Sequence, residues 1–92
     1  MANRARGRIV RITPRQGATF IRLELDSKEP RPKDDYFELA LEHKNYNSLY
    51  SLVLAAAVNR WPITVVATDE IISSREARVG YINVDWAAGQ SD

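Results

Sequence analysis

Near the middle of the chain lies the run LYSLVLAAAV, residues 49–58. Apolar residues recur in it at the i, i+3, i+4, i+7 spacing of one helical face, which predicts an amphipathic helix. These residues are Leu49, Leu52, Val53 and Ala56. The opposite side of the helix is apolar as well, because it holds Tyr50, Leu54, Ala57 and Val58. A small domain can cover only one of these sides, so we expect the second one to pack against a neighbouring molecule.

Polar and helix-breaking residues flank this run. Before it, residues 42–47 form a polar connector, and Asn45, Asn47 or Ser48 is expected to cap the helix. After Asn59 and Arg60 comes Trp61-Pro62, where the proline cannot continue a helix. Tryptophan is enriched at protein interfaces, so a tryptophan at the exposed end of a helix is an interface candidate. The predicted oligomer interface therefore consists of Tyr50, Leu54, Ala57, Val58 and Trp61.

Five stretches rich in β-branched or alternating apolar residues surround the helix and predict strands. They are residues 7–13, 18–25, 36–41, 63–68 and 78–86. The first two are joined by the turn Pro14–Gly17, which favours a hairpin. The longer connector 26–35 contains Pro30 and Pro32 and is expected to be a loop. Ile71 and Ile72, in the last connector, are expected either to form a short strand or to fill one end of the fold.

The predicted order is strand, strand, strand, helix, strand, strand, in a mainly β domain with one helix. This order within 92 residues favours a five-stranded Greek-key barrel, the OB-fold. An open α+β sheet with one packed helix is the alternative. The barrel is favoured because each strand has a single apolar face, and closure removes unpaired edges. We expect residues 1–6 to be a flexible basic N-terminus, residues 7–86 to be one OB-fold-like domain, and residues 87–92 to be a tail.

The stretch YNSLYSLVLAAAVNRWPITV, residues 46–65, resembles the B subunits of bacterial toxins of the pertussis and subtilase type. Those proteins have a capped helix with small residues, a short polar turn, and a strand of alternating branched residues. The order of elements over residues 7–86 is also similar. The resemblance implies an OB-fold, assembly into a pentameric ring with the helices lining a central pore, and binding of cell-surface glycans.

Charge is distributed unevenly along the chain. The first 22 residues contain six arginines and no acid, whereas the remainder contains seven basic and twelve acidic residues. The arginines indicate either phosphate binding or a solvated edge strand. Phe20, Arg22 and Tyr36 are expected on the outward face of the second and third strands, together with Glu38. OB-folds bind oligonucleotides or sugars on this face, so these three residues are the ligand-binding candidates.

An alternative role of the candidate side chains and the charge around them both weigh against a nucleic-acid ligand. The candidate side chains can serve as cross-strand packing or as a subunit contact. In addition, several acidic residues lie close to them in the predicted strands and loop, namely Glu24, Asp34, Asp35 and Glu38.

Other functional classes find little support in the sequence. The chain has no cysteine and a single histidine, His43, so no metal site, cofactor or catalytic residue is expected. Residues 1–8 lack the apolar segment of a secretory signal, so a cytoplasmic location is expected by default, or a secreted one if a signal was removed. The longest apolar run is far shorter than the roughly 20 residues that span a bilayer, so no membrane insertion is expected.

The expected function is therefore that of a non-catalytic, self-associating OB-fold module with a glycan or protein ligand. A single-stranded nucleic-acid-binding OB-fold protein is the alternative.

Overall fold

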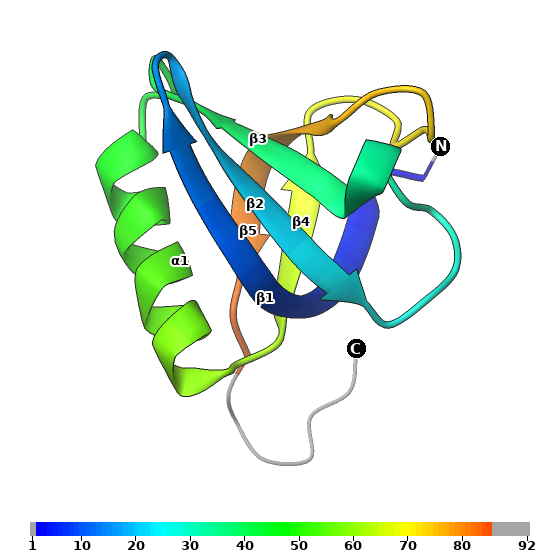
Figure 1. The fold of residues 1–92 in the computed structure, drawn as a ribbon, viewed down its shortest axis with the longest axis horizontal. Helices are drawn as coiled ribbons and strands as arrows, with labels where there is room; N and C mark the ends of the chain where they lie inside the picture. The colour runs from blue at the N-terminus through cyan, green and yellow to red at the C-terminus, as the bar shows by residue number, and fades with distance from the viewer. Residues whose placement is uncertain (1, 86–92) are drawn as a thin grey trace.

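In the computed structural model, which describes residues 2–85, five strands form one mixed sheet (Figure 1). The strands are β1 (Arg4–Arg15), β2 (Ala18–Leu25), β3 (Tyr36–Ala40), β4 (Ile63–Ala67) and β5 (Ala77–Asn83). Helix α1 (Tyr46–Asn59) connects β3 to β4, and the short 3-10 helix η1 (Lys33–Asp35) precedes β3. The domain is thus mainly β with one α-helix, as predicted. Its order of elements differs from the predicted one by η1, which lies in the connector that we expected to be a plain loop.

The sheet closes into a ring. Neighbouring strands follow the order β1-β2-β3-β5-β4, and β4 pairs in turn with β1. The strand pairs are antiparallel except for β3 with β5, which run parallel over the short register Phe37 to Ala77 and Glu38 to Arg78. The alternative of an open sheet is therefore excluded for residues 2–85.

Strand β1 begins earlier than predicted. Arg4 pairs with Val66 of β4 and Gly7 pairs with Ile63, so residues 4–6 belong to the sheet. The sequence predicts a flexible basic N-terminus over residues 1–6, whereas backbone pairing with β4 places residues 4–6 in the sheet. The pairing register shifts between Ile9 and Arg11, which marks a β-bulge at Val10. The bulge explains the two adjacent apolar residues: Ile9 packs against the core, whereas Val10 is exposed.

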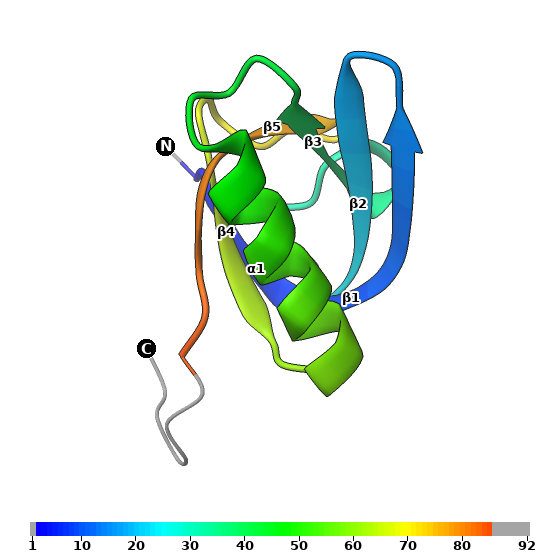
Figure 2. The ribbon, with the colours of Figure 1, turned by 90° about the vertical axis from the view of Figure 1, so that its left-hand side faces the viewer.

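The core lies inside the ring and under α1. Its fully buried side chains include Ile21, Leu23, Phe37, Leu39, Val65 and Val79 from the strands. Helix α1 adds Leu49, Val53 and Ala56 to the same cluster, and Figure 2 shows the helix lying across the side of the closed sheet. Ile71 is buried in this cluster while Ile72 is exposed. Neither residue forms the short strand that was one expectation for this pair, and only Ile71 is buried.

The ends of α1 are held by backbone and histidine contacts. Arg60 adopts the left-handed conformation after the last helical residue, and the amide of Trp61 donates to the carbonyl of Ala56. Asn45 occupies the predicted cap position, but its side chain makes no capping hydrogen bond. The backbone N–H of Asn45 instead donates to Nδ1 of His43, 3.0 Å away.

His43 has a structural role. Because Nδ1 accepts a hydrogen bond, Nε2 carries the proton and donates to the carbonyl of Gly80 at 2.8 Å. The single histidine thus ties the connector before α1 to strand β5.

The predicted strand boundaries are otherwise close to the observed ones, and β2 has the predicted bounds. The predicted last strand extends to Trp86, whereas β5 ends at Asn83, and Val84 and Asp85 do not belong to a strand. Trp86 and the predicted tail, residues 87–92, lie outside the described residues.

Candidate ligand-binding face

The bulge in β1 brings its arginines to one side of the strand. Alternate residues of a strand point to opposite faces, so Arg4, Arg6 and Arg8 share the outer face. Without the extra residue at Val10, Arg11 would point inward. The bulge shifts the alternation by one position, and Arg11 is exposed like the three arginines before it.

Carboxylates partner only part of this row. Arg6 forms an ion pair with Asp26 through a 2.7 Å contact between Nη1 and Oδ2. Arg8 lies opposite Glu24 in the register, and its Nε donates to the carbonyl of Arg60 at 3.1 Å. Towards the far end of β1, no ion pair from residues 2–85 reaches the exposed arginines. Within residues 2–85 the positive charge of this face is therefore compensated by an ion pair at Arg6 and uncompensated at the end of β1.

Arg22 of β2 occupies the centre of the uncompensated part. In the register it lies between Arg11 of β1 and Tyr36 of β3. Arg11 donates to the hydroxyl of Tyr36 at 3.2 Å, whereas the Arg22 side chain has no hydrogen bond or ion pair within residues 2–85. Like charges directly opposite each other destabilise a sheet. An anion between the two guanidinium groups would remove this repulsion.

Two aromatic rings border the arginine pair. Phe20 and Tyr36 pack edge to face, with ring centroids 6.4 Å apart. The guanidinium carbon of Arg15 lies 5.7 Å from the centroid of the Phe20 ring, within the range of a cation–π contact. The structure thus brings together the three residues that the sequence predicted for this face, namely Phe20, Arg22 and Tyr36.

The sequence places Arg11 and Arg15 among the N-terminal arginines that indicate phosphate binding, but it does not show on which face of β1 they lie. Simple alternation from Gly7 places both of them on the inner side of β1. The signal that would have found them is the adjacent apolar pair Ile9-Val10, which breaks the alternation where the bulge occurs.

A cavity of about 220 Å³ opens at the end of this face. It is lined by Thr13, Arg15, Phe20, Asp34, Tyr36 and Glu76, and we call it the Phe20 cavity. Asp34 adopts a φ of 55°, in the left-handed region that aspartate enters more readily than most residues. Its neighbour Asp35 is engaged elsewhere, because Arg31 donates two hydrogen bonds to its carboxylate at 2.8 and 3.0 Å. The hydrogen bond and charge of Asp35 raise the pKa of Arg31 above its ordinary value.

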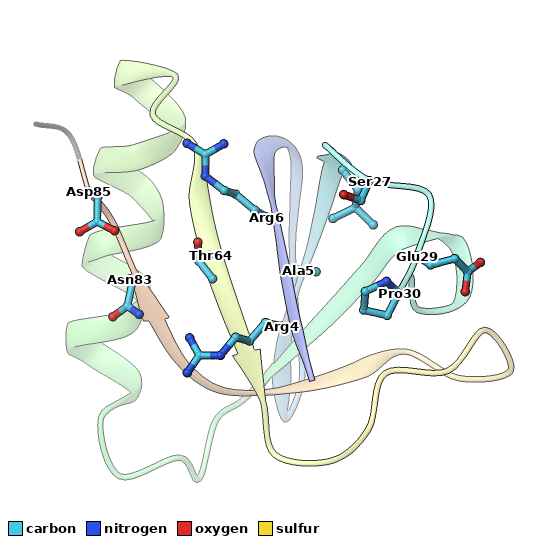
Figure 3. A pocket seen from close by; sticks show the side chains of 10 residues that line it. Arg4, Ala5, Arg6, Ser27, Glu29, Pro30, Thr64, Asn83 and Asp85 are labelled. Carbon is cyan, nitrogen blue, oxygen red and sulfur yellow. The ribbon is translucent and has the colours of Figure 1, made fainter. Parts of the chain in front are cut away.

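A second, larger cavity of about 570 Å³ lies at the other end of β1. Figure 3 shows Arg4 and Arg6 extending from β1 towards β4, with Asn83 and Asp85 beyond it. Its charges are mixed, since Glu29 and Asp85 line it and Arg6 is already paired with Asp26. Among residues 2–85, no aromatic ring lines it. It is therefore the weaker candidate for a ligand site within residues 2–85.

The predicted oligomer interface is only partly exposed. Tyr50 stacks on Tyr46, with ring centroids 5.8 Å apart, and both Tyr50 and Trp61 pack against the domain's own core. Ala57 is half-buried. Leu54 and Val58 remain on the outside, with 42% and 82% of their surfaces exposed. The second apolar side of α1 is thus narrower than the sequence indicated, because the chain itself covers part of it.

Residues 2–85 contain neither a cluster of metal ligands nor a helix that could cross a membrane. No group of three or more His, Cys, Asp or Glu side chains is placed there to hold a metal ion. None of the helices in that range combines the length and apolar character that a membrane crossing requires.

Comparison of the chain with protein-family models, with curated proteins and with solved structures finds no match. The resemblance to toxin B subunits therefore stays a prediction from the sequence.

Proposed function

We propose that this chain is an OB-fold-like Greek-key barrel that binds single-stranded nucleic acid on the outer face of β1, β2 and β3. The closed strand order and the position of α1 between β3 and β4 support the barrel assignment. OB-folds bind oligonucleotides on the face that includes the second and third strands. In this chain that face carries uncompensated arginines beside aromatic rings.

The observation that carries the proposal is the opposition of Arg11 and Arg22 without a carboxylate partner. Like charges opposite each other in a sheet are destabilising, and the phosphate groups of a nucleic acid would supply the missing counter-charge. Phe20 and Tyr36 lie beside the pair and offer surfaces for stacking. Stacking of a base on an aromatic side chain contributes about 1–3 kcal/mol.

A single strand fits this arrangement better than a duplex. Bases can stack on protein side chains only when they are free of their own partners, as in single-stranded segments. Arg4 and Arg8, which form no ion pair within residues 2–85, extend the positive surface away from the aromatic rings. Arg4, Arg6 and Arg8 recur every two residues, which is about 6.6 Å along a strand. Such a row can follow the phosphates of an extended strand.

Fluorescence anisotropy with short labelled single-stranded RNA and DNA tests the proposal. Binding is expected at low salt, and the logarithm of the association constant is expected to fall linearly with the logarithm of the salt concentration. Arg22→Gln should weaken binding and reduce the magnitude of this slope by about 0.7, the value for one phosphate contact with a single strand.

Lys44→Gln is the matched control, because it removes one positive charge from an exposed residue of the connector before α1. It should leave both the affinity and the slope nearly unchanged. Absence of binding at low salt, or an equal effect of the two variants, would contradict the proposal.

A second candidate function is self-association through α1. The helix contains no charged residue from Tyr46 to Asn59, and Leu54 and Val58 are exposed on it. The centres of protein interfaces are depleted in charged residues. A second copy of this chain is the proposed occupant, because two such helices can face each other without burying an unpaired charge. The pentameric ring and the glycan ligand implied by the toxin resemblance belong to this candidate.

Multi-angle light scattering across a concentration series tests self-association. Leu54→Glu should shift an oligomer towards the monomer, since it places a charge in the interface. Gln16→Glu, in the exposed turn between β1 and β2, is the control that adds the same charge elsewhere. A monomeric wild-type protein at high concentration would remove this candidate and leave nucleic-acid binding unaffected.

A further inference from the structure

The Phe20 cavity combines groups that phosphate binding alone does not require. Arg15 contributes a guanidinium group, and Phe20 and Tyr36 contribute aromatic rings. Asp34 and Glu76 add two carboxylates to the lining. Carboxylates repel phosphate, so their presence beside an arginine pair calls for a different kind of ligand group.

Both carboxylates are available to a ligand. Neither the Asp34 nor the Glu76 side chain has a hydrogen bond or an ion pair within residues 2–85. The neighbouring Asp35, in contrast, is held by Arg31. An ionised carboxylate only accepts hydrogen bonds, so the cavity selects for a ligand edge that presents N–H donors.

Guanine fits this set of groups best among the bases. Its Watson–Crick edge presents two adjacent N–H donors, and its O6 and N7 atoms accept a bidentate pair of bonds from arginine. Adenine and cytosine each place an acceptor nitrogen beside their amino group, and uracil places carbonyl oxygens on both sides of its N–H. We propose, on the basis of the nucleic-acid function above, that the Phe20 cavity binds a guanine base of a single strand.

The position of the cavity agrees with this assignment. Thr13 pairs with Phe20 in the register, and Arg11 pairs with Arg22 two positions away along β2. Two positions correspond to about 6.6 Å along a strand. A phosphate on the arginine pair and a base in the cavity can therefore belong to the same nucleotide or to its neighbour. The volume of about 220 Å³ is smaller than that of most pockets for drug-sized ligands, which agrees with a ligand group as small as one base.

Binding of short oligouridylates that carry one central guanine, adenine or cytosine tests the inference, with unsubstituted oligouridylate as reference. The guanine-containing strand should bind about tenfold more tightly than the reference, as expected for one bidentate contact to a base. Asp34→Asn and Glu76→Gln should each reduce this preference while leaving binding of the reference strand unchanged or tighter.

The variants are chosen to preserve the fold. Asparagine accepts the left-handed conformation of residue 34 as readily as aspartate does. Asp69→Asn is the control, because Asp69 is an exposed acid of the β4–β5 connector that does not line the cavity. It should keep the full preference for guanine.

The outcomes separate the two proposals. If the wild-type protein binds all four oligonucleotides equally, the guanine site is overturned and the nucleic-acid function still stands. Absence of binding to every strand at low salt would overturn the nucleic-acid function and the guanine site with it. Loss of preference in Asp69→Asn as well would show that general charge, not the cavity, causes the selectivity, and would also overturn the site.

Discussion

Strand β1 and helix α1 contribute to the same core but differ on their outer sides. On their inner sides, Ala5 of β1 and Val53 of α1 belong to one buried cluster. On its outer side β1 presents arginines, whereas α1 has no charged residue along its whole length. Packing dictates the inner residues of both elements, because each must exclude water from the core. The outer residues are free of that demand, so the contrast between a cationic strand and a neutral helix bears on what each element binds.

The largest expected effect comes from the inner side of β1. A Cβ added at Gly7 would overlap the backbone carbonyl of Glu24 on β2. Gly7→Ala should therefore destabilise the domain by about 3 kcal/mol, because backbone atoms of a paired strand cannot move aside easily. Urea denaturation measures the change. Gly17→Ala is the control, with a φ of 80° and no heavy atom of the described chain within 4 Å of the added carbon.

The control should cost about 1 kcal/mol, since only the left-handed backbone opposes it. An equal loss in both variants would mean that Gly7 is not held tightly against β2.

The two sides of α1 provide the next test. Val53 is fully buried and Val58 is 82% exposed on the same helix. Val53→Ala should lower the free energy of unfolding by about 2 kcal/mol through lost burial. Val58→Ala should change it by less than about 0.5 kcal/mol in the monomer. A large effect of Val58→Ala that grows with protein concentration would instead support self-association through this side.

The polar contact between α1 and β2 gives a smaller effect. Thr19 and Tyr46 share a 2.7 Å hydrogen bond between their hydroxyl groups, and Thr19 is buried. Thr19→Val should cost about 1 kcal/mol, because the Tyr46 hydroxyl loses its partner. In a double-mutant cycle, Tyr46→Phe should cost less in the Thr19→Val background than in the wild-type protein. Additive costs would show that this bond does not join the helix to the strand.

The smallest expected effect is a gain in stability. Arg22→Gln removes the repulsion with Arg11 and should stabilise the domain by about 0.5 kcal/mol, even though it weakens nucleic-acid binding. The gain should shrink at high salt, which screens exposed charges. Arg78→Gln is the control, because Arg78 lies opposite Glu38 rather than another arginine. Thermal unfolding at two salt concentrations measures both variants, and a loss of stability in Arg22→Gln would contradict the uncompensated pair.

Local patterns in the sequence predicted much of the fold and of the candidate ligand-binding face. Apolar spacing along residues 49–58 predicted the helix and its buried side, and strict alternation predicted β2 with its observed bounds. The same alternation placed Phe20, Arg22 and Tyr36 on one face, where the structure has them. These inferences succeeded because each depends on a repeat within one element, which follows from backbone geometry alone.

The inferences that failed depend on interruptions or on distant partners. The bulge at Val10 reverses the alternation of β1, so the sides on which Arg11 and Arg15 lie do not follow from alternation along the strand. Pairing of residues 4–6 with β4 was missed for the same kind of reason, since no local pattern announces a partner strand that lies far along the chain.

Repeats within single elements were thus sufficient to predict the types of the elements and their inner residues. The concentration of arginine near the start of the chain could be read directly from the sequence. Contacts between distant segments settled the rest: closure of the sheet through β3 with β5 and β4 with β1, the opposition of Arg11 and Arg22, and the meeting of Asp34 and Glu76 in one cavity. The physical reason is that periodicity arises from the backbone of one element, whereas register and closure depend on the packing of the whole core.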